Sequence, residues 1–82
     1  MSETTSQNEP LNTLPIGQRA RVVAFDLPAD QRQRLLEMGL TAGVEIQIVR
    51  FAPLGDPLEI KVRGSHLSLR KKEAAGIQVA RI

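Results

Sequence analysis

Hydrophobic and polar residues alternate along much of the chain, which is the pattern of short β-strands that bury one face. The cleanest alternation covers 58–62, where Leu, Ile and Val are separated by Glu and Lys. The same two-residue period predicts strands at 44–49 and 66–70, and a short last strand at 77–79.

A further strand is predicted at 18–25. Ala20, Val22 and Ala24 lie on one side of its two-residue period, so we expect all three side chains to face the core. Together with the other four segments, this gives five short strands in the chain.

Over 27–38 the period lengthens to between three and four residues, which predicts a helix. Pro28 suits the first helical position, and Asp30 would lie in the first turn, where the helix dipole favours an anion. Gly39 follows the last periodic residue and is the expected left-handed cap. The apolar residues expected on the inward stripe are Leu35, Leu36, Met38 and Leu40.

Glycine and proline residues mark the connections between strands. In the segment 51–57, Pro53 suits the first central position of a type I turn that ends at Gly55. The pair Gly64–Ser65 predicts a two-residue type II′ turn between the third and fourth strands. Both connections are short, so we expect the strands that they join to be antiparallel neighbours.

The two ends of the chain differ in character. Residues 1–10 are almost entirely polar, which predicts a flexible tail. This segment also lacks the features of a signal peptide. Residues 11–82 hold the periodic segments and are expected to form a single domain. Near the C-terminus, 71–75 predicts one turn of helix that stops at Gly76.

These elements predict a mostly β fold with one inserted helix and a short C-terminal helical turn. About five antiparallel strands are best accommodated in a small barrel, because closure protects the strand edges that an open sheet would expose. An SH3-like barrel fits best. An OB-fold is the alternative, although its strands are usually longer.

The charge of the chain is unevenly distributed. The net charge is +2, but residues 1–10 carry −2 from two glutamates, and residues 11–82 carry +4 from all 11 bases and the other 7 acids. A mildly basic domain is compatible with an acidic protein partner, a phosphate group or an anionic membrane face. It is less basic than most nucleic-acid-binding domains. Trp and Tyr are absent, which disfavours base stacking and the binding of Pro-rich peptides.

The sequence offers little catalytic or metal-binding chemistry. Cysteine is absent and His66 is the single histidine, so a cage of several histidines cannot form within one chain. His66, Asp56 and Glu59 are weak candidates for a metal site, and solvated polar side chains at strand ends are the favoured interpretation. No phosphate-binding loop or catalytic triad is present. We therefore predict no catalytic residue, no cofactor and no enzymatic activity.

Two features are candidates for partner binding. Leu54 lies at the tip of the predicted 51–57 turn, next to Pro53, where an apolar side chain either folds back into the core or is an exposed anchor for a partner. The second feature is basic charge, for which a solvated surface, docking onto an acidic partner and contact with nucleic-acid phosphate are all open interpretations. The basic candidates are Arg32, Arg34, Arg70, Lys71 and Lys72.

Three segments carry a family resemblance. Residues 34–43 read RLLEMGLTAG, residues 52–58 read APLGDPL, and residues 67–79 begin LSLRKKEAAG. In order and spacing they resemble the motifs of the FeoA family, ferrous iron transport protein A. The resemblance covers about residues 11–82, with Ala42 at a turn where family members often have Pro.

The resemblance implies an SH3-like barrel with an inserted helix, in agreement with the periodicity. It also implies a small cytoplasmic accessory protein of a bacterial ferrous iron uptake system, with transition metal ion binding attributed at the level of the family. The implied partner is the membrane GTPase permease of that system, FeoB, which would recruit the protein to the inner membrane. Neither nucleic-acid binding nor direct membrane insertion is expected.

Two other functions are compatible with the same fold. The first is a module that assists an iron-responsive transcriptional regulator or binds nucleic acid directly. The second is a weak metal sensor. The modest charge and the scarcity of aromatic residues argue against the first function, and the single histidine argues against the second.

Overall fold

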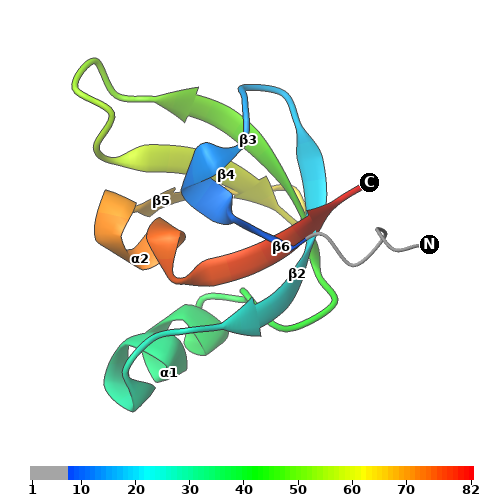
Figure 1. Cartoon of the computed structure of the whole chain (residues 1–82), viewed down its shortest axis with the longest axis vertical. Coiled ribbons are helices and arrows are strands. Elements are labelled where there is room, and N and C mark those ends of the chain that lie inside the picture. The colour runs from blue at the N-terminus through cyan, green and yellow to red at the C-terminus, as the bar shows by residue number, and fades with distance from the viewer. Residues whose placement is uncertain (1–7) are drawn as a thin grey trace.

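In the computed structural model, which describes residues 8–82, the strands form one six-stranded antiparallel sheet (Figure 1). The strands are β1 (Glu9–Pro10), β2 (Arg19–Phe25), β3 (Glu45–Phe51), β4 (Leu58–Val62), β5 (Ser65–Leu69) and β6 (Ile77–Arg81). The helical elements are the 3₁₀ turn η2 (Leu11–Thr13), the helix α1 (Ala29–Glu37) and the short helix α2 (Lys71–Ala75). Within residues 8–82, no helix has the length and apolar character needed to cross a bilayer.

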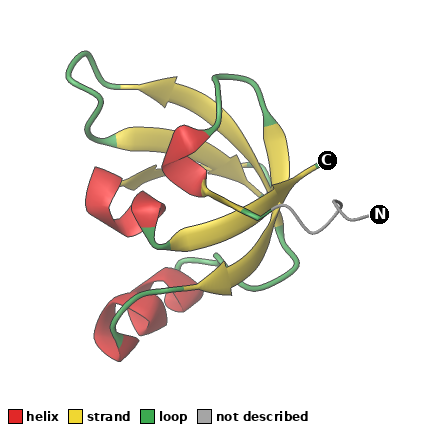
Figure 2. Cartoon of the chain, viewed as in Figure 1, coloured by secondary structure: helices red, strands yellow, loops and turns green. Residues whose placement is uncertain are grey.

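The sheet order β1-β6-β2-β3-β4-β5 places the last strand in the chain next to the first two. Helix α2 connects the edge strand β5 to β6 and packs against η2, so helical segments lie between the two ends of the sheet (Figure 2). This is the mostly β, SH3-like fold with one inserted helix that the sequence predicts, with six strands instead of five.

The additional strand, β1, corrects the predicted boundary of the tail. Glu9 and Pro10, which the sequence places in the tail, pair with β6. Pro10 is tolerated because β1 is an edge strand, where a missing N–H donor does little harm. The remainder of the predicted tail, residues 1–7, lies outside the described residues.

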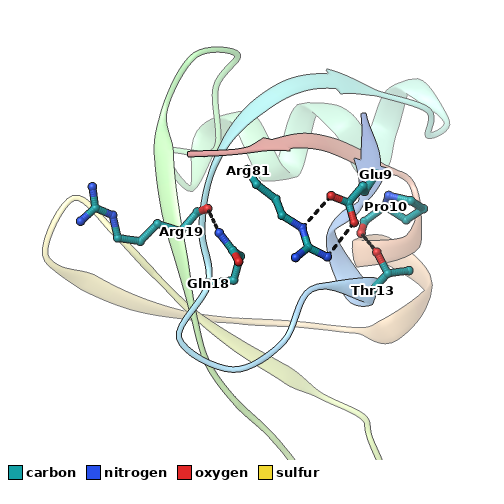
Figure 3. A network of polar contacts seen from close by, with 6 residues as sticks. All are labelled: Glu9, Pro10, Thr13, Gln18, Arg19 and Arg81. Atoms are coloured by element: carbon teal, nitrogen blue, oxygen red, sulfur yellow. Dashed lines mark hydrogen bonds and ion pairs between the residues drawn. The ribbon is translucent and has the colours of Figure 1, made fainter. Parts of the chain in front are cut away.

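A bidentate ion pair holds β1 against β6. The guanidinium of Arg81 donates hydrogen bonds of 2.7 and 3.0 Å to the two carboxylate oxygens of Glu9 (Figure 3). These hydrogen bonds keep the pKa of the Glu9 carboxyl below its ordinary value. The Oγ1 hydroxyl of Thr13 also donates to the carbonyl of Pro10 over 2.7 Å, which closes the turn that follows β1.

Strand β2 changes its buried face part-way along its length. Ala20 and Val22 are buried as predicted, but a bulge in the pairing with β6 falls between Val22 and Ala24. Beyond the bulge, Ala24 is exposed and Phe25 packs against the core. The prediction that Ala24 faces the core is wrong, because the extra residue of a bulge moves the following side chains to the opposite face.

Helix α1 is inserted between β2 and β3. Pro28 is the residue before the helix and not its first residue, while Asp30 lies in the first turn as predicted. Leu35 is fully buried, but Met38, the C-cap residue after the helix, is 41% exposed. Met38 is therefore not part of the inward stripe. Gly39 adopts a φ of +97°, which confirms the predicted left-handed cap.

The turn between β4 and β5 lies one residue earlier than predicted. Val62 pairs with Ser65, so the two-residue loop consists of Arg63 and Gly64. Both have positive φ, 51° and 83°, which is the geometry of a type I′ turn. The prediction of a type II′ turn at Gly64–Ser65 is wrong because Gly64 occupies the second central position of the turn, not the first.

The interior of the barrel is packed with aliphatic side chains contributed by every element except β1. The two phenylalanines, Phe25 and Phe51, pack against this core and are only half-buried. Because the core is filled, the surface is where this domain can contact other molecules. The buried apolar residues are Leu11, Leu14, Ala20, Val22, Leu35, Leu40, Ile46, Ile48, Leu58, Ile60, Val62, Leu69, Ala74, Ile77 and Val79.

Candidate docking surface

The loop between β3 and β4 presents one apolar side chain to solvent. Leu54, at the tip of the loop, is 93% exposed, more than any other large hydrophobic residue of the described chain. The structure therefore excludes the alternative in which the loop folds back and buries Leu54.

Two backbone hydrogen bonds shape this loop. The N–H of Gly55 donates to the carbonyl of Ala52 over 2.7 Å, and the N–H of Ala52 donates to the carbonyl of Pro57 over 3.0 Å. The first bond places Pro53 at the first central position of the turn, as the sequence predicts. The tip is thus held by the fixed φ of a proline and by hydrogen bonds at its base.

Asp56 joins the loop to α2. Its Oδ1 atom accepts a hydrogen bond of 3.0 Å from the backbone N–H of Lys71, the first residue of α2. N–H groups in the first turn of a helix have no partner within the helix, so the Asp56 carboxylate satisfies one of them. The loop and α2 consequently lie on the same side of the molecule, at the left in Figure 1.

Basic side chains gather where α2 begins. Arg70, Lys71 and Lys72 are all exposed, and none forms an ion pair with any of residues 8–82. The three residues line an open groove together with Asn12 and Asp56. Positive charge is therefore adjacent to the loop that carries Leu54.

Five of the seven residues proposed from sequence as partner contacts lie on this one surface. We call it the tip–α2 surface and define it as Pro53–Gly55 together with Arg70–Lys72. Its two parts are separated by 14 intervening residues in the chain, from 56 to 69, and are connected in space through Asp56. It combines an apolar tip with exposed cationic side chains.

The other two candidates are on α1 and differ from each other. Arg34 forms an ion pair with Glu73 of α2, whose carboxylate is buried. The second oxygen of Glu73 accepts a hydrogen bond of 3.1 Å from the backbone N–H of Arg70. The charge of Arg34 is thus compensated within the domain. Arg32 is exposed and has no ion-pair partner within residues 8–82.

The sequence around Glu73 gives little indication that this side chain is buried between two helices. It lies three residues after Arg70, the spacing of a capping box, but such boxes are recognised by Ser or Thr at the first position. Its burial depends on the contact with Arg34, which is distant in the chain. A local pattern therefore does not predict that this carboxylate connects the two helices.

The three weak candidates for a metal site do not share a site. Two of the side chains bind other residues, and the third is exposed. Asp56 is bonded to α2, and Glu59 forms an ion pair of 3.5 Å with Arg50. His66 is exposed and lies opposite Lys61 in the pairing of β4 with β5. In the part of the chain that the structure describes, no group of three His, Cys, Asp or Glu residues could hold a metal ion.

Comparison with known proteins assigns a family to this fold. The family model of the FeoA domain matches residues 9–81. The chain belongs to the FeoA family. The match confirms the resemblance in the three sequence segments, and it starts at the residue where β1 begins.

FeoA proteins of known structure share the whole fold. The FeoA protein from Chlorobium tepidum is 40% identical, with a TM-score of 0.85 over 89% of this chain and 70% of that chain. The FeoA-like protein from Clostridium acetobutylicum is 35% identical, with a TM-score of 0.86 over 94% of this chain and 90% of that chain. The predicted fold class is confirmed by these structures.

One curated relative is much longer than this chain. It is a fusion protein of Fe(2+) transport protein A and the Fe(2+) transporter FeoB from Porphyromonas gingivalis. The two sequences are 38% identical over 69 residues, which is 84% of this chain and 8% of the fusion protein. This chain therefore corresponds to one small part of that relative.

The FeoA fold also occurs within metal-dependent repressors. The chain matches T. acidophilum IdeR with a TM-score of 0.84 at 20% identity, and it covers 37% of that protein. It matches a manganese-dependent transcriptional repressor with a TM-score of 0.87 at 14% identity, covering 38% of that chain. At these identities the likeness shows the fold alone.

Proposed function

We propose that this chain is an accessory protein of ferrous iron uptake that acts by binding a FeoB-type membrane GTPase permease at the cytoplasmic face of the membrane. The observation that carries the proposal is the fusion protein of Porphyromonas gingivalis, in which a homologous domain and FeoB share one polypeptide. A fusion keeps the two parts together at every stage of their function.

The fusion indicates what a chain that is not fused to FeoB needs in order to act on it. Joining two binding partners through a linker raises their effective concentration to roughly the millimolar range for short flexible linkers. This benefit exists only when the two parts contact each other. A domain that is not fused must reach the same contact through its own surface, which requires an exposed binding patch.

The structure supports action by surface contact. The interior is filled with aliphatic side chains, and the candidate metal residues of the described chain are not gathered into a cluster. The features that do stand out, an exposed leucine and unpaired basic residues, are those of a protein-binding surface. The proposal includes no enzymatic step and no resident cofactor.

The alternative role in transcriptional regulation has weaker support. The likeness to metal-dependent repressors is one of fold, at identities of 20% or less for the two described above. The FeoA and FeoA-like proteins described above match at 40% and 35% identity over 89% and 94% of this chain. The proposal therefore places the chain with the transporter, without a nucleic-acid partner.

A binding experiment with the intact permease tests this proposal. The full chain, labelled with a fluorophore at its N-terminus, is titrated with the full-length permease from the same genome in lipid nanodiscs. We expect saturable binding, which unlabelled chain reverses. Empty nanodiscs serve as the control. An anisotropy that stays unchanged up to about 100 μM permease would contradict the proposal, because any binding would then be weaker than about 5.5 kcal/mol.

A further inference from the structure

Leu54 is exposed although the fold of the domain does not require an apolar side chain at that place. Most residue types are compatible with a type I turn. At 93% exposure, Leu54 contributes almost nothing to the core, so a polar residue would serve the isolated domain equally well. A leucine in this setting is suited to fill a pocket on another molecule.

The loop presents this leucine in a prepared conformation. The backbone hydrogen bonds of Ala52 and the bond from Lys71 to Asp56 hold the loop at its base. Less backbone entropy is therefore lost when the loop binds, and pre-organisation of this kind increases affinity.

The charges beside the tip define what the pocket must look like. Arg70, Lys71 and Lys72 are exposed next to the loop, and Glu73, the acid that follows them, is already paired with Arg34. The tip–α2 surface therefore offers one apolar projection with three cationic side chains at the base of its loop, where they outnumber the carboxylate of Asp56. Its complement is an apolar pocket with carboxylates along its rim.

A lipid surface matches these features less well. Segments that bind at a membrane interface usually insert several apolar side chains, often aromatic ones, beside a basic cluster. Here the tip has a single leucine, Trp is absent, and both phenylalanines pack against the core. One leucine with a few basic residues provides only marginal attachment to a bilayer.

We infer that the tip–α2 surface is the face that binds the permease, with Leu54 seated in an acidic-rimmed apolar pocket on a cytoplasmic surface of that protein. This inference rests on the proposed function and adds to it the residues and the chemistry of the partner. Leu54 mainly determines the dissociation rate, since its contacts form only in the complex. Lys71 and Lys72 mainly raise the association rate, through attraction that salt screens.

The apolar part of the inference is tested with Leu54→Glu in the nanodisc assay. We expect the Kd for the permease to rise at least tenfold, or about 1.4 kcal/mol, chiefly through faster dissociation. Leu54→Ala should give a smaller change in the same direction. Ile16→Glu is the matched control, because Ile16 is 63% exposed on the loop before β2 and should bind as the wild type does. Circular dichroism and thermal melts check that each variant is folded.

The basic part is tested with the double variant Lys71→Glu and Lys72→Glu. We expect weaker binding at low salt and little difference at high salt. The control is Lys61→Glu with Arg63→Asp, which changes the net charge by the same amount at the other end of β4. Aspartate is chosen at 63 because it tolerates the positive φ found there. This control should have the smaller effect on the association rate.

The outcomes separate the inference from the proposed function. Wild-type chain that does not bind the permease contradicts both. Wild-type binding that Leu54→Glu leaves unchanged overturns the inference and preserves the proposed function. Unfolding of both Leu54 variants would show that Leu54 belongs to the core, which also overturns it. Binding to protein-free phosphatidylglycerol vesicles, with the same loss in Leu54→Glu, would assign the surface to lipid and reject the permease pocket.

Discussion

The guanidinium of Arg34 on α1 pairs with the carboxylate of Glu73 on α2, a side chain that is only 9% exposed. The same carboxylate accepts the N–H of Arg70 at the start of α2. One acidic side chain thus connects the inserted helix to the short helix that carries the basic residues of the tip–α2 surface. This contact links the two helices directly.

Removing Arg34 should destabilise the domain. Arg34→Gln leaves a buried carboxylate without its charge partner, for which we expect a loss of about 1–3 kcal/mol in the free energy of unfolding. In Arg34→Gln with Glu73→Gln, the amide at 73 can still accept the Arg70 N–H and no buried charge remains. We therefore expect the double variant to be more stable than Arg34→Gln alone, as measured by urea denaturation. A double-mutant cycle with additive single effects would show that the two side chains do not interact.

Gly76 should not tolerate a side chain, for a steric reason. A Cβ atom at this position would lie 2.7 Å from the carbonyl oxygen of Asp26 and would overlap the side chain of Leu27. The backbone segments at Asp26 and Gly76 cannot easily separate, because the N–H of Asp26 donates to the carbonyl of Gly76 over 2.6 Å. We expect Gly76→Ala to lower the unfolding free energy by about 1–3 kcal/mol. Ala75→Ser is the control at the adjacent residue, which is exposed. If neither Gly76→Ala nor Ala75→Ser changes the melting temperature, Gly76 is not in close contact with Asp26 and Leu27.

The stability of the domain should fall in acid partly because of Glu9. Its pKa is lower in the folded chain than the ordinary value of 4.5, chiefly through the hydrogen bond from Arg81. A carboxyl with a lowered folded-state pKa adds stability above its unfolded pKa, and this stability is lost as the pH falls through the folded pKa. The difference in melting temperature between wild type and Glu9→Gln should therefore be largest above pH 4.5 and should shrink at lower pH. A difference that grows on acidification would contradict the ion pair.

The isolated chain should not bind Fe²⁺ tightly. Asp56 is bonded to α2, Glu59 is paired with Arg50, and His66 lies elsewhere on the outer face of the sheet. A stable iron site needs several ligands in one place. Anaerobic calorimetry should give no 1:1 binding at micromolar affinity. Such binding, if lost in His66→Ala, would establish a metal site at this histidine.

The local parts of the fold could be predicted from sequence. The alternation at 58–62 identifies β4 and its buried face, because side-chain period and burial coincide in a strand with one exposed side. Gly39 is recognisable as the cap of α1, because a positive φ is cheap only for glycine. The exposed tip at Leu54 follows less directly, since the sequence left its burial open.

The features that sequence does not predict depend on contacts between distant segments. β1 forms by pairing with β6 at the other end of the chain, where Glu9 also meets Arg81. The bulge after Val22 arises in the pairing of β2 with β6, which brings together an early and the last strand of the chain. The burial of Glu73 requires Arg34 from another helix. Periodicity reports on neighbours along the chain, so it carries no information on these three contacts.

Hydrogen exchange measured on the intact complex shows which face of this chain contacts the permease, and it requires no substitution. The full chain is exchanged alone and with the full-length permease in nanodiscs, and its peptides are followed by mass spectrometry. We expect binding to slow exchange at 51–57 and 70–75, the loop and α2. Exchange at 14–18, the loop that carries Ile16, should stay unchanged. Slowed exchange at 14–18 with no change at 51–57 would contradict this expectation and would place the contact on another face.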